Sequence, residues 1–156
     1  MQNIKIFFDK EKVFQPSNIK PLVGIVGLYF IFSKDSPILY PFHPSRLIYI
    51  GMSERKTNSI GIRLGGHYDG QSGNIGLVNY RKVETLYFTY LNFEMLRGIW
   101  KHRVEDLESF FIMDFVLNYG VYPICNNRTG TEIMRAYEDT ALAIDWSYFE
   151  KKEDET

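Results

Sequence analysis

The segment that decides the fold is VGIVGLYFIF, residues 23–32. Its Val, Ile, Tyr and Phe side chains are typical of a buried strand. A second apolar segment, LIYI at residues 47–50, is closed by Gly51, and the proline-rich residues 33–46 connect the two segments. Two successive strands joined by such a loop predict an antiparallel hairpin.

Working outward from this hairpin, the chain predicts a third strand and two helices. Residues 85–93 alternate between apolar and polar side chains, which predicts the strand. Helical spacing of apolar residues predicts a long helix over 98–119, ended by Gly120. A shorter helix is expected over 60–68, with Ser59 as its N-cap. We therefore expect an α/β (α+β) fold, in which helices flank a small, mainly antiparallel three-stranded sheet.

The remaining segments give weaker patterns. Residues 4–8 predict a short strand, and two prolines predict a loop over residues 16–21. The glycine-containing residues 69–79 predict another loop, and residues 131–143 predict a further helix.

The composition predicts a single packed domain. The chain has 156 residues, of which 45% are hydrophobic and 16% aromatic, so one core can form without disulfides. We assign residues 1–149 to this domain and residues 150–156 to an acidic tail. Cys125 is the only cysteine, which favours a reducing compartment, and we expect the cytoplasm. No apolar run approaches the length that spans a bilayer, so we expect no membrane partner.

The charges are unevenly distributed along the chain. The overall net charge is −1, but residues 46–103 contain nine Lys or Arg and four acids, a net charge of +5. Residues 104–156 contain four Lys or Arg and twelve acids, a net charge of −8. Such segregation allows a positive surface on a nearly neutral protein, which suits a nucleic-acid partner.

Several common catalytic patterns are absent from the sequence. The three histidines and one cysteine do not have the spacing of a zinc site. The glycines at residues 65–66 are not followed by the Lys-Ser/Thr of a phosphate-binding loop, which disfavours nucleotide hydrolysis. No Gly-x-Ser-x-Gly motif of an esterase is present.

A set of polar residues follows the predicted elements and suits phosphodiester cleavage. An arginine can stabilise phosphoryl charge, and a histidine can help a tyrosine to activate water. A carboxylate can hold a divalent cation. The candidates, in chain order, are Tyr29, Tyr49, Arg63, His67, Glu108 and Asn126.

The order of these motifs along the chain, and the residues within each motif, resemble the GIY-YIG nuclease family. GLY at residues 27–29 stands for the first motif, and YIG at residues 49–51 is the second. Arg63 and His67, four residues apart, resemble the arginine–histidine pair of some restriction-type members. Glu108 resembles the family's glutamate on a later helix, and PICN, ending in Asn126, resembles its closing segment.

The resemblance implies a divalent-metal-dependent endonuclease that cuts DNA, most readily duplex DNA. It implies that Tyr29, aided by His67, positions or deprotonates the water. It further implies that Tyr49 orients the phosphate or water and that Arg63 stabilises the phosphoryl charge. With an unperturbed His67 pKa, activity is expected to decline below about pH 6.5.

The resemblance also implies that Glu108 holds Mg²⁺ or Mn²⁺, and that Asn126 fixes either the glutamate or a strand backbone. Asp114 competes with Glu108 for the metal, since it lies closer to the family's usual distance from Asn126. Met52 stands where a lysine often follows the second motif, so His67 is expected to carry more of the proton handling.

Alternative functions remain open at this stage. One is a non-catalytic nucleic-acid-binding or structural module of nuclease-like fold, and another is a nuclease acting on RNA or branched substrates. The oligomeric state is open as well, with a homodimer as one option.

Overall fold

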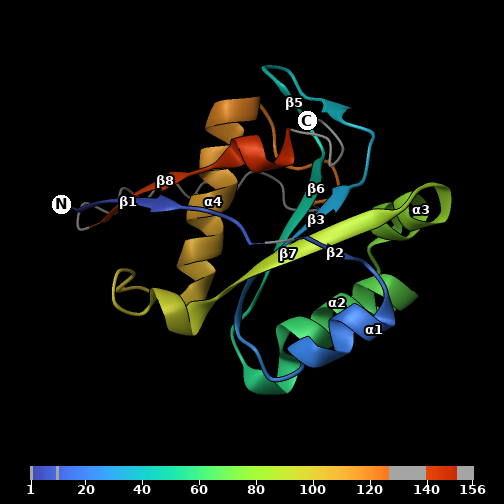
Figure 1. The fold of residues 1–156 in the computed structure, drawn as a ribbon, viewed down its shortest axis with the longest axis horizontal. Helices are drawn as coiled ribbons and strands as arrows, with labels where there is room; N and C mark the ends of the chain where they lie inside the picture. The colour runs from blue at the N-terminus through green and yellow to red at the C-terminus, as the bar shows by residue number, and fades with distance from the viewer. Residues whose placement is uncertain (1, 10, 127–139, 151–156) are drawn as a thin grey trace.

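The centre of the protein is an antiparallel four-stranded sheet. The computed structural model describes residues 2–9, 11–126 and 140–150. Helices α1 and α2 lie side by side on one face of this sheet, and α4 covers the other face (Figure 1). The sheet has the order β2 (Lys12–Val13), β7 (Leu86–Asn92), β3 (Gly27–Ser33) and β6 (Leu47–Ser53). The helices are α1 (Pro16–Ile19), α2 (Ile60–Asp69), α3 (Ile75–Val83) and α4 (Val104–Tyr119).

Among the residues that the structure describes, two small two-stranded sheets and four short 3₁₀ helices accompany the central sheet. The small sheets are β1 (Gln2–Ile6) with β8 (Thr140–Ile144), which is parallel, and β4 (Ile38–Leu39) with β5 (Pro44–Ser45), which is antiparallel. The 3₁₀ helices are η1 (Lys20–Leu22), η2 (Lys56–Asn58), η3 (Phe93–Leu96) and η4 (Trp146–Phe149).

The expected hairpin and third strand are present, and the mixed α+β architecture is confirmed. β3 pairs antiparallel with β6 on one side and with β7 on the other. We expected three strands, but the sheet has four, because the two-residue strand β2 pairs with the outer edge of β7 at Phe88 and Tyr87. Two residues are too few to show a periodicity in the sequence, so β2 is defined by its pairing partner.

Strand β3 is buried along its whole length, as its composition predicts. Alternate side chains of a strand point to opposite faces of the sheet. Leu28 and Phe30 therefore pack into the core beneath α4, while Tyr29 and Ile31 pack into the core beneath α1 and α2. The central strand thus supplies both cores of the molecule.

Helix α4 begins later than the sequence predicts. It starts at Val104 instead of residue 98, because residues 98–103 are used in a turn in which the Trp100 indole N–H donates to the Arg103 carbonyl at 2.9 Å. The helix ends at Gly120, as expected, with a φ of 99°. A side chain there would also lie 2.8 Å from Pro41, so both backbone conformation and space require glycine.

Three expectations for the irregular segments were wrong where the structure describes them. Residues 16–22 form α1 and η1 instead of a loop, with Pro16 in the first turn where its missing N–H costs nothing. Much of the expected loop 69–79 belongs to α3, whose N-cap Asn74 accepts a hydrogen bond from the Leu77 N–H. Of the expected helix 131–143, residues 131–139 lie outside the described residues, and residues 140–143 belong to β8.

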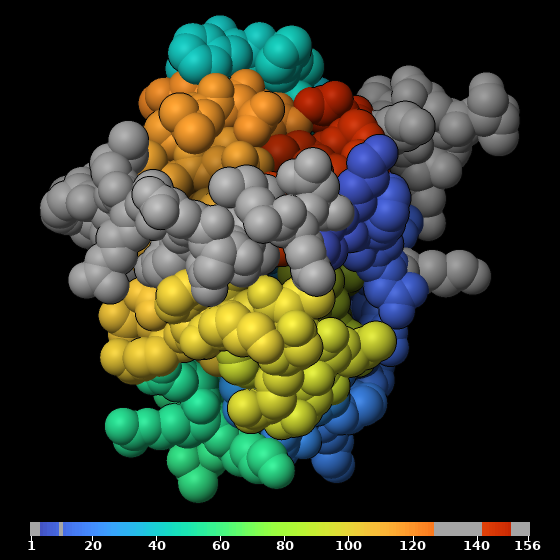
Figure 2. Space-filling model, turned by 90° about the vertical axis from the view of Figure 1, so that its left-hand side faces the viewer, coloured from blue at the N-terminus to red at the C-terminus, as the bar shows by residue number. Residues whose placement is uncertain are grey.

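The connection between β3 and β6 forms a hairpin that lies over the end of α4 (Figure 2). The Phe42 N–H donates to the Tyr119 carbonyl at 3.2 Å. Arg46, which is buried at the base of this hairpin, donates to the Ser33 and Tyr148 carbonyls and so ties it to η4. Within the described parts of the chain, the structure contains no helix that is both long and apolar enough to span a membrane.

Candidate functional site

A chain of hydrogen bonds links four side chains on the α2 face of the sheet. The Tyr29 hydroxyl lies 2.9 Å from His67 Nε2, and the Arg63 Nε–H donates to the Tyr29 oxygen at 3.3 Å. His67 Nδ1 lies 2.8 Å from Ser72 Oγ. The structure therefore brings together three of the residues expected from sequence, and it adds a serine that the sequence analysis did not identify.

The second tyrosine packs against the same group. The Tyr49 ring meets the His67 ring edge-on, with centroids 4.9 Å apart, and stacks near the Tyr29 ring at 6.0 Å. Gly51, opposite Tyr29 in the sheet, makes room for this arrangement, because a Cβ there would lie 2.3 Å from the Tyr29 ring. The glycine of the second motif thus shapes the space that the first tyrosine occupies.

The position of α2 follows from local contacts at its start. The Ile60 N–H donates to the Ile25 carbonyl at 2.8 Å, so the first turn of the helix is attached to the segment that leads into β3. A Cβ on Gly61 would lie 2.4 Å from the Val23 backbone nitrogen, so this close approach requires glycine. Arg63 and His67, one helical turn apart, consequently face Tyr29 together.

Burial governs the protonation of this group. Burial, followed by the nearby Tyr49, raises the pKa of the Tyr29 phenol far above its ordinary value, while Arg63 opposes the rise. Burial and then the Arg63 charge lower the pKa of His67 from 6.5 to about 4. At neutral pH the site thus holds a protonated phenol and a neutral imidazole. The expected decline in activity below about pH 6.5 assumed an unperturbed His67 pKa, and this assumption was wrong.

Arg63 stays a cation in these surroundings. Burial alone would lower its pKa, but the neighbouring Tyr29, Tyr49 and Glu108 outweigh this effect and raise it. The site therefore has a permanent positive charge beside the phenol, as phosphate stabilisation requires.

A pocket of about 340 Å³ opens beside this group. Arg63, His67 and Ser72 line it together with the amide side chains of Asn58 and Gln71, and its other lining residues are Ile62 and Gly66. Lys56, which belongs to η2 together with Asn58, and Arg55, which directly precedes η2, are exposed. The pocket therefore lies between the hydrogen-bonded side chains and a basic part of the surface.

Glu108 lies on α4 and is 5% exposed. Its carboxylate is close enough to raise the pKa of both Tyr29 and Arg63, although it is a minor contributor to each shift. No group of three or more His, Cys, Asp or Glu side chains suited to a metal occurs among the described residues. A carboxylate of this kind fits Mg²⁺, which is commonly held by one or two protein carboxylates together with water and substrate phosphate.

The competing carboxylate, Asp114, lies in different surroundings. The Trp146 indole N–H donates to its carboxylate at 2.7 Å, and Asn118 donates to the same oxygen at 3.4 Å. Burial raises its pKa, which the bond from Trp146 partly offsets. Asp114 thus connects α4 to η4.

Asn126 binds the outer strand of the sheet. Its side-chain oxygen accepts from the Ile50 N–H at 3.0 Å, and its amide N–H donates to the Ile50 carbonyl at 2.9 Å. The Cys125 N–H adds a bond to the Ile48 carbonyl at 2.8 Å. Of the two roles expected for Asn126, these contacts correspond to fixing a strand backbone, that of β6 beside Tyr49.

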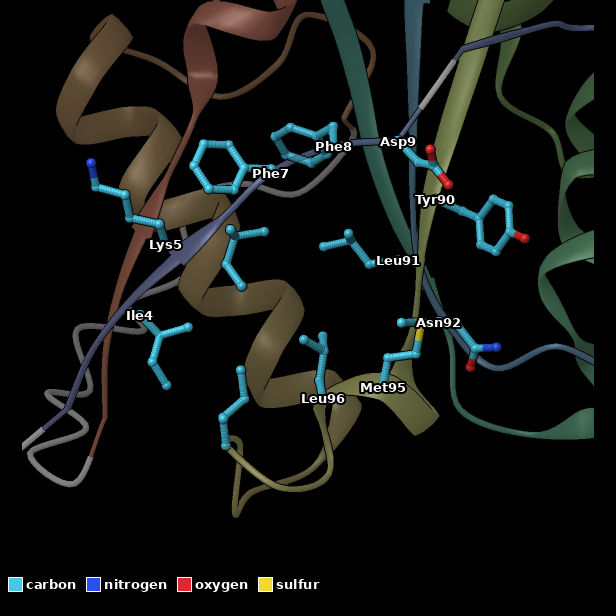
Figure 3. A pocket seen from close by; sticks show the side chains of 12 residues that line it. Ile4, Lys5, Phe7, Phe8, Asp9, Tyr90, Leu91, Asn92, Met95 and Leu96 are labelled. Atoms are coloured by element: carbon cyan, nitrogen blue, oxygen red, sulfur yellow. The ribbon is translucent and has the colours of Figure 1, made fainter.

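A larger hollow of about 540 Å³ lies between β1, β7 and η3 (Figure 3). Its walls are mainly apolar, with Phe7, Leu91 and Met95 among them, and Lys5 and Asp9 are its charged residues. Leu91 belongs to the face of the sheet opposite Tyr29. We place the candidate site at the smaller pocket, because that pocket contains the hydrogen-bonded chain.

Sequence reasoning missed two residues that lie in the turn between α2 and α3 and contact the site residues or the segment beside them. Ser72 binds His67, and the Asn74 side chain donates to the Cys125 carbonyl at 2.9 Å. Glycines at 70 and 73, both with positive φ, were the available signal, since they mark a tight turn directly after the His67 helix.

Comparisons of the chain with protein-family models, with curated proteins and with solved structures found no match. The family resemblance therefore rests on the motif residues themselves and stays a hypothesis.

Proposed function

We propose that this protein is a divalent-metal-dependent endonuclease that hydrolyses DNA phosphodiester bonds through a GIY-YIG-type site. The observation that carries the proposal is the chain from Arg63 through Tyr29 and His67 to Ser72 beside a pocket. It combines a fixed cation, a phenol and a neutral imidazole, which are the groups that phosphate binding and water activation need.

Tyr29 and His67 move the proton of the attacking water. As the water oxygen bonds to phosphorus, its proton passes to the Tyr29 oxygen, and the Tyr29 proton passes to His67 Nε2 at 2.9 Å. The phenol is therefore never a free phenolate, which its raised pKa would make costly. The phosphorus–oxygen bond to the leaving group breaks in the same displacement.

Arg63 binds the phosphate and so links substrate binding to the basicity of His67. Its guanidinium lines the pocket and can donate its outer N–H groups to phosphoryl oxygens while Nε holds Tyr29. The Arg63 charge is one of the causes of the low His67 pKa. A bound phosphate partly neutralises that charge, so the His67 pKa rises when substrate binds.

Tyr49 and Glu108 complete the proposed machinery. Tyr49 packs on the His67 ring and orients the water or phosphate. Glu108 would hold Mg²⁺ or Mn²⁺ through its buried carboxylate. The ion, when bound, would supply positive charge to the phosphoryl and leaving oxygens. The exposed Arg55 and Lys56 fit the phosphate backbone of the substrate.

The direct test is cleavage of supercoiled plasmid by the purified protein. Nicking or linearisation with Mg²⁺ or Mn²⁺, and none with EDTA, is the expected result. Glu108→Gln should bind DNA but lose cleavage, whereas the matched control Asp114→Asn should cut normally. If Asp114→Asn is inactive and Glu108→Gln cuts, the metal ligand has been assigned to the wrong carboxylate.

Other substrates distinguish the alternatives. Single-stranded DNA, branched DNA and RNA should be cut more slowly than duplex DNA. DNA binding without cleavage of any substrate with either metal would refute the enzyme and leave a binding module.

A further inference from the structure

We propose that Ser72 is a positioning residue that fixes the tautomer of His67. In this role Ser72 accepts the Nδ1–H of the imidazole, so that Nε2 carries a lone pair for the Tyr29 hydroxyl. The consequence for catalysis rests on the proposed function, whereas the tautomer itself is a property of the folded protein and can be measured without substrate.

The turn that carries Ser72 is fixed at several points. The Ser72 N–H and the Gly70 N–H both donate to the Gly66 carbonyl at 3.1 Å, which folds the chain back on the end of α2. Gly70 and Gly73 have φ angles of 89° and 80°, which favour glycine. Asn74 ties the other side of the turn to Cys125 at 2.9 Å. Ser72 is therefore held against His67 although its residue is exposed.

The directions of the hydrogen bonds follow from the donors that cannot change. Arg63 Nε always donates, so the Tyr29 oxygen is an acceptor in that bond. Among the described residues, His67 Nε2 is the acceptor within reach of the Tyr29 O–H, at 2.9 Å. Nε2 must then be unprotonated, and in a neutral imidazole the proton resides on Nδ1. Nδ1–H points at Ser72 Oγ, 2.8 Å away.

The serine is suited to the acceptor role. Its Oγ also lies 3.3 Å from the Asn74 backbone nitrogen, which can only donate. With the Asn74 N–H and the His67 Nδ1–H donated to it, the Ser72 hydroxyl keeps its own hydrogen for the pocket that it lines.

Loss of this bond would leave Nδ1–H without its partner, so the tautomer that the Tyr29 O–H favours at Nε2 would lose the stabilisation from Ser72 and the other tautomer would become populated. With the proton on Nε2, His67 would donate to Tyr29 instead of accepting from it, and the water proton could no longer pass through Tyr29. The groups facing His67 are Tyr29 from β3, Tyr49 from β6, Arg63 from α2 and Ser72 from the turn. Of these, Ser72 is the group that contacts Nδ1.

The test measures the tautomer by NMR and the rate by plasmid cleavage. The chain has three histidines, so the His67 ring nitrogens can be assigned by comparison with His67→Gln. In the wild type at neutral pH we expect a protonated Nδ1 and an unprotonated Nε2. In Ser72→Ala we expect a large share of the Nε2–H form and about a tenfold loss of kcat with little change in KM.

Two variants separate positioning from a structural effect. Ser72→Thr keeps the hydroxyl and should restore both the tautomer and the rate. Ser17→Ala, which removes an exposed serine on α1, should change neither. An Nδ1–H tautomer that persists in folded Ser72→Ala would overturn the role of Ser72, whatever the rate. A protein without nuclease activity would refute the proposed function, while the NMR result would still decide the tautomer.

Discussion

The two faces of the central sheet differ in what they bury. The face under α4 is an aromatic core in which the Phe30 ring packs against the rings of Phe111 and Phe149. The face under α2 buries hydrogen-bonded polar side chains, among them Tyr29 and His67, which are 0% and 4% exposed. Both faces receive alternate residues of the same strand, β3.

This difference separates stability from chemistry. Apolar side chains stabilise the fold by leaving water, whereas buried polar groups contribute little net stability and are costly when a partner is lost. The α4 face is therefore expected to carry most of the folding free energy. The α2 face holds a few groups in fixed positions, with their pKa values shifted away from the ordinary range.

The largest expected effect is on the α4 face. Phe111→Ala removes a fully buried ring and should lower the free energy of unfolding by about 3–5 kcal/mol, measured by urea denaturation. Plasmid cleavage at low temperature, where the variant is still folded, should stay close to wild type. A loss smaller than that caused by Tyr29→Phe would contradict the division between the two faces.

On the α2 face, Arg63→Ala should act on the rate instead. Removal of a charge that stabilises the transition state costs about 2.7–4 kcal/mol, or roughly a hundred- to a thousandfold in kcat. The melting temperature should change little, because Arg63 is only partly buried. Arg97→Ala, which removes an exposed arginine paired with Glu94, is the matched control and should cut normally. Unchanged turnover in Arg63→Ala would remove Arg63 from the site.

The pH dependence of stability tests the buried imidazole. The His67 pKa is about 4 in the folded protein and near 6.5 in the unfolded chain, so the unfolded chain takes up the proton first as the pH falls. Stability is therefore lost between these values, with a loss of about 2 kcal/mol by pH 5. His67→Gln should lack this contribution, which appears as a shallower fall in unfolding free energy between pH 7 and pH 5. Equal slopes for the two proteins would show that His67 titrates normally.

The smallest expected effect concerns the edge of the sheet. Asn126→Ala removes two hydrogen bonds to the Ile50 backbone and should cost about 1 kcal/mol for each bond that water does not replace. Hydrogen exchange at the Ile50 amide should accelerate, while cleavage falls only a few fold. Complete loss of cleavage with normal exchange would instead give Asn126 a direct part in the reaction.

Much of the architecture could be predicted from local pattern. The apolar run before Ser33, the alternation in β7 and the glycine after α4 each depend on neighbouring residues, so the sequence is enough to identify them. The short elements could not be predicted in this way. Strand β2 is defined by its pairing with the outer edge of β7. Residues 98–103, which we expected to begin α4, instead form a turn around Trp100.

The features of the candidate site also divide into those set by local sequence and those set by tertiary structure. The sequence by itself determined the residue types and their order: two tyrosines on neighbouring strands, with Arg63 and His67 one turn apart on a helix. Only the tertiary structure decided that Tyr29 and His67 share a hydrogen bond, that Ser72 completes it, and that the imidazole is neutral. The physical reason is that spacing along a chain sets which side chains share a face, whereas burial and hydrogen-bond partners come from segments far apart in the sequence.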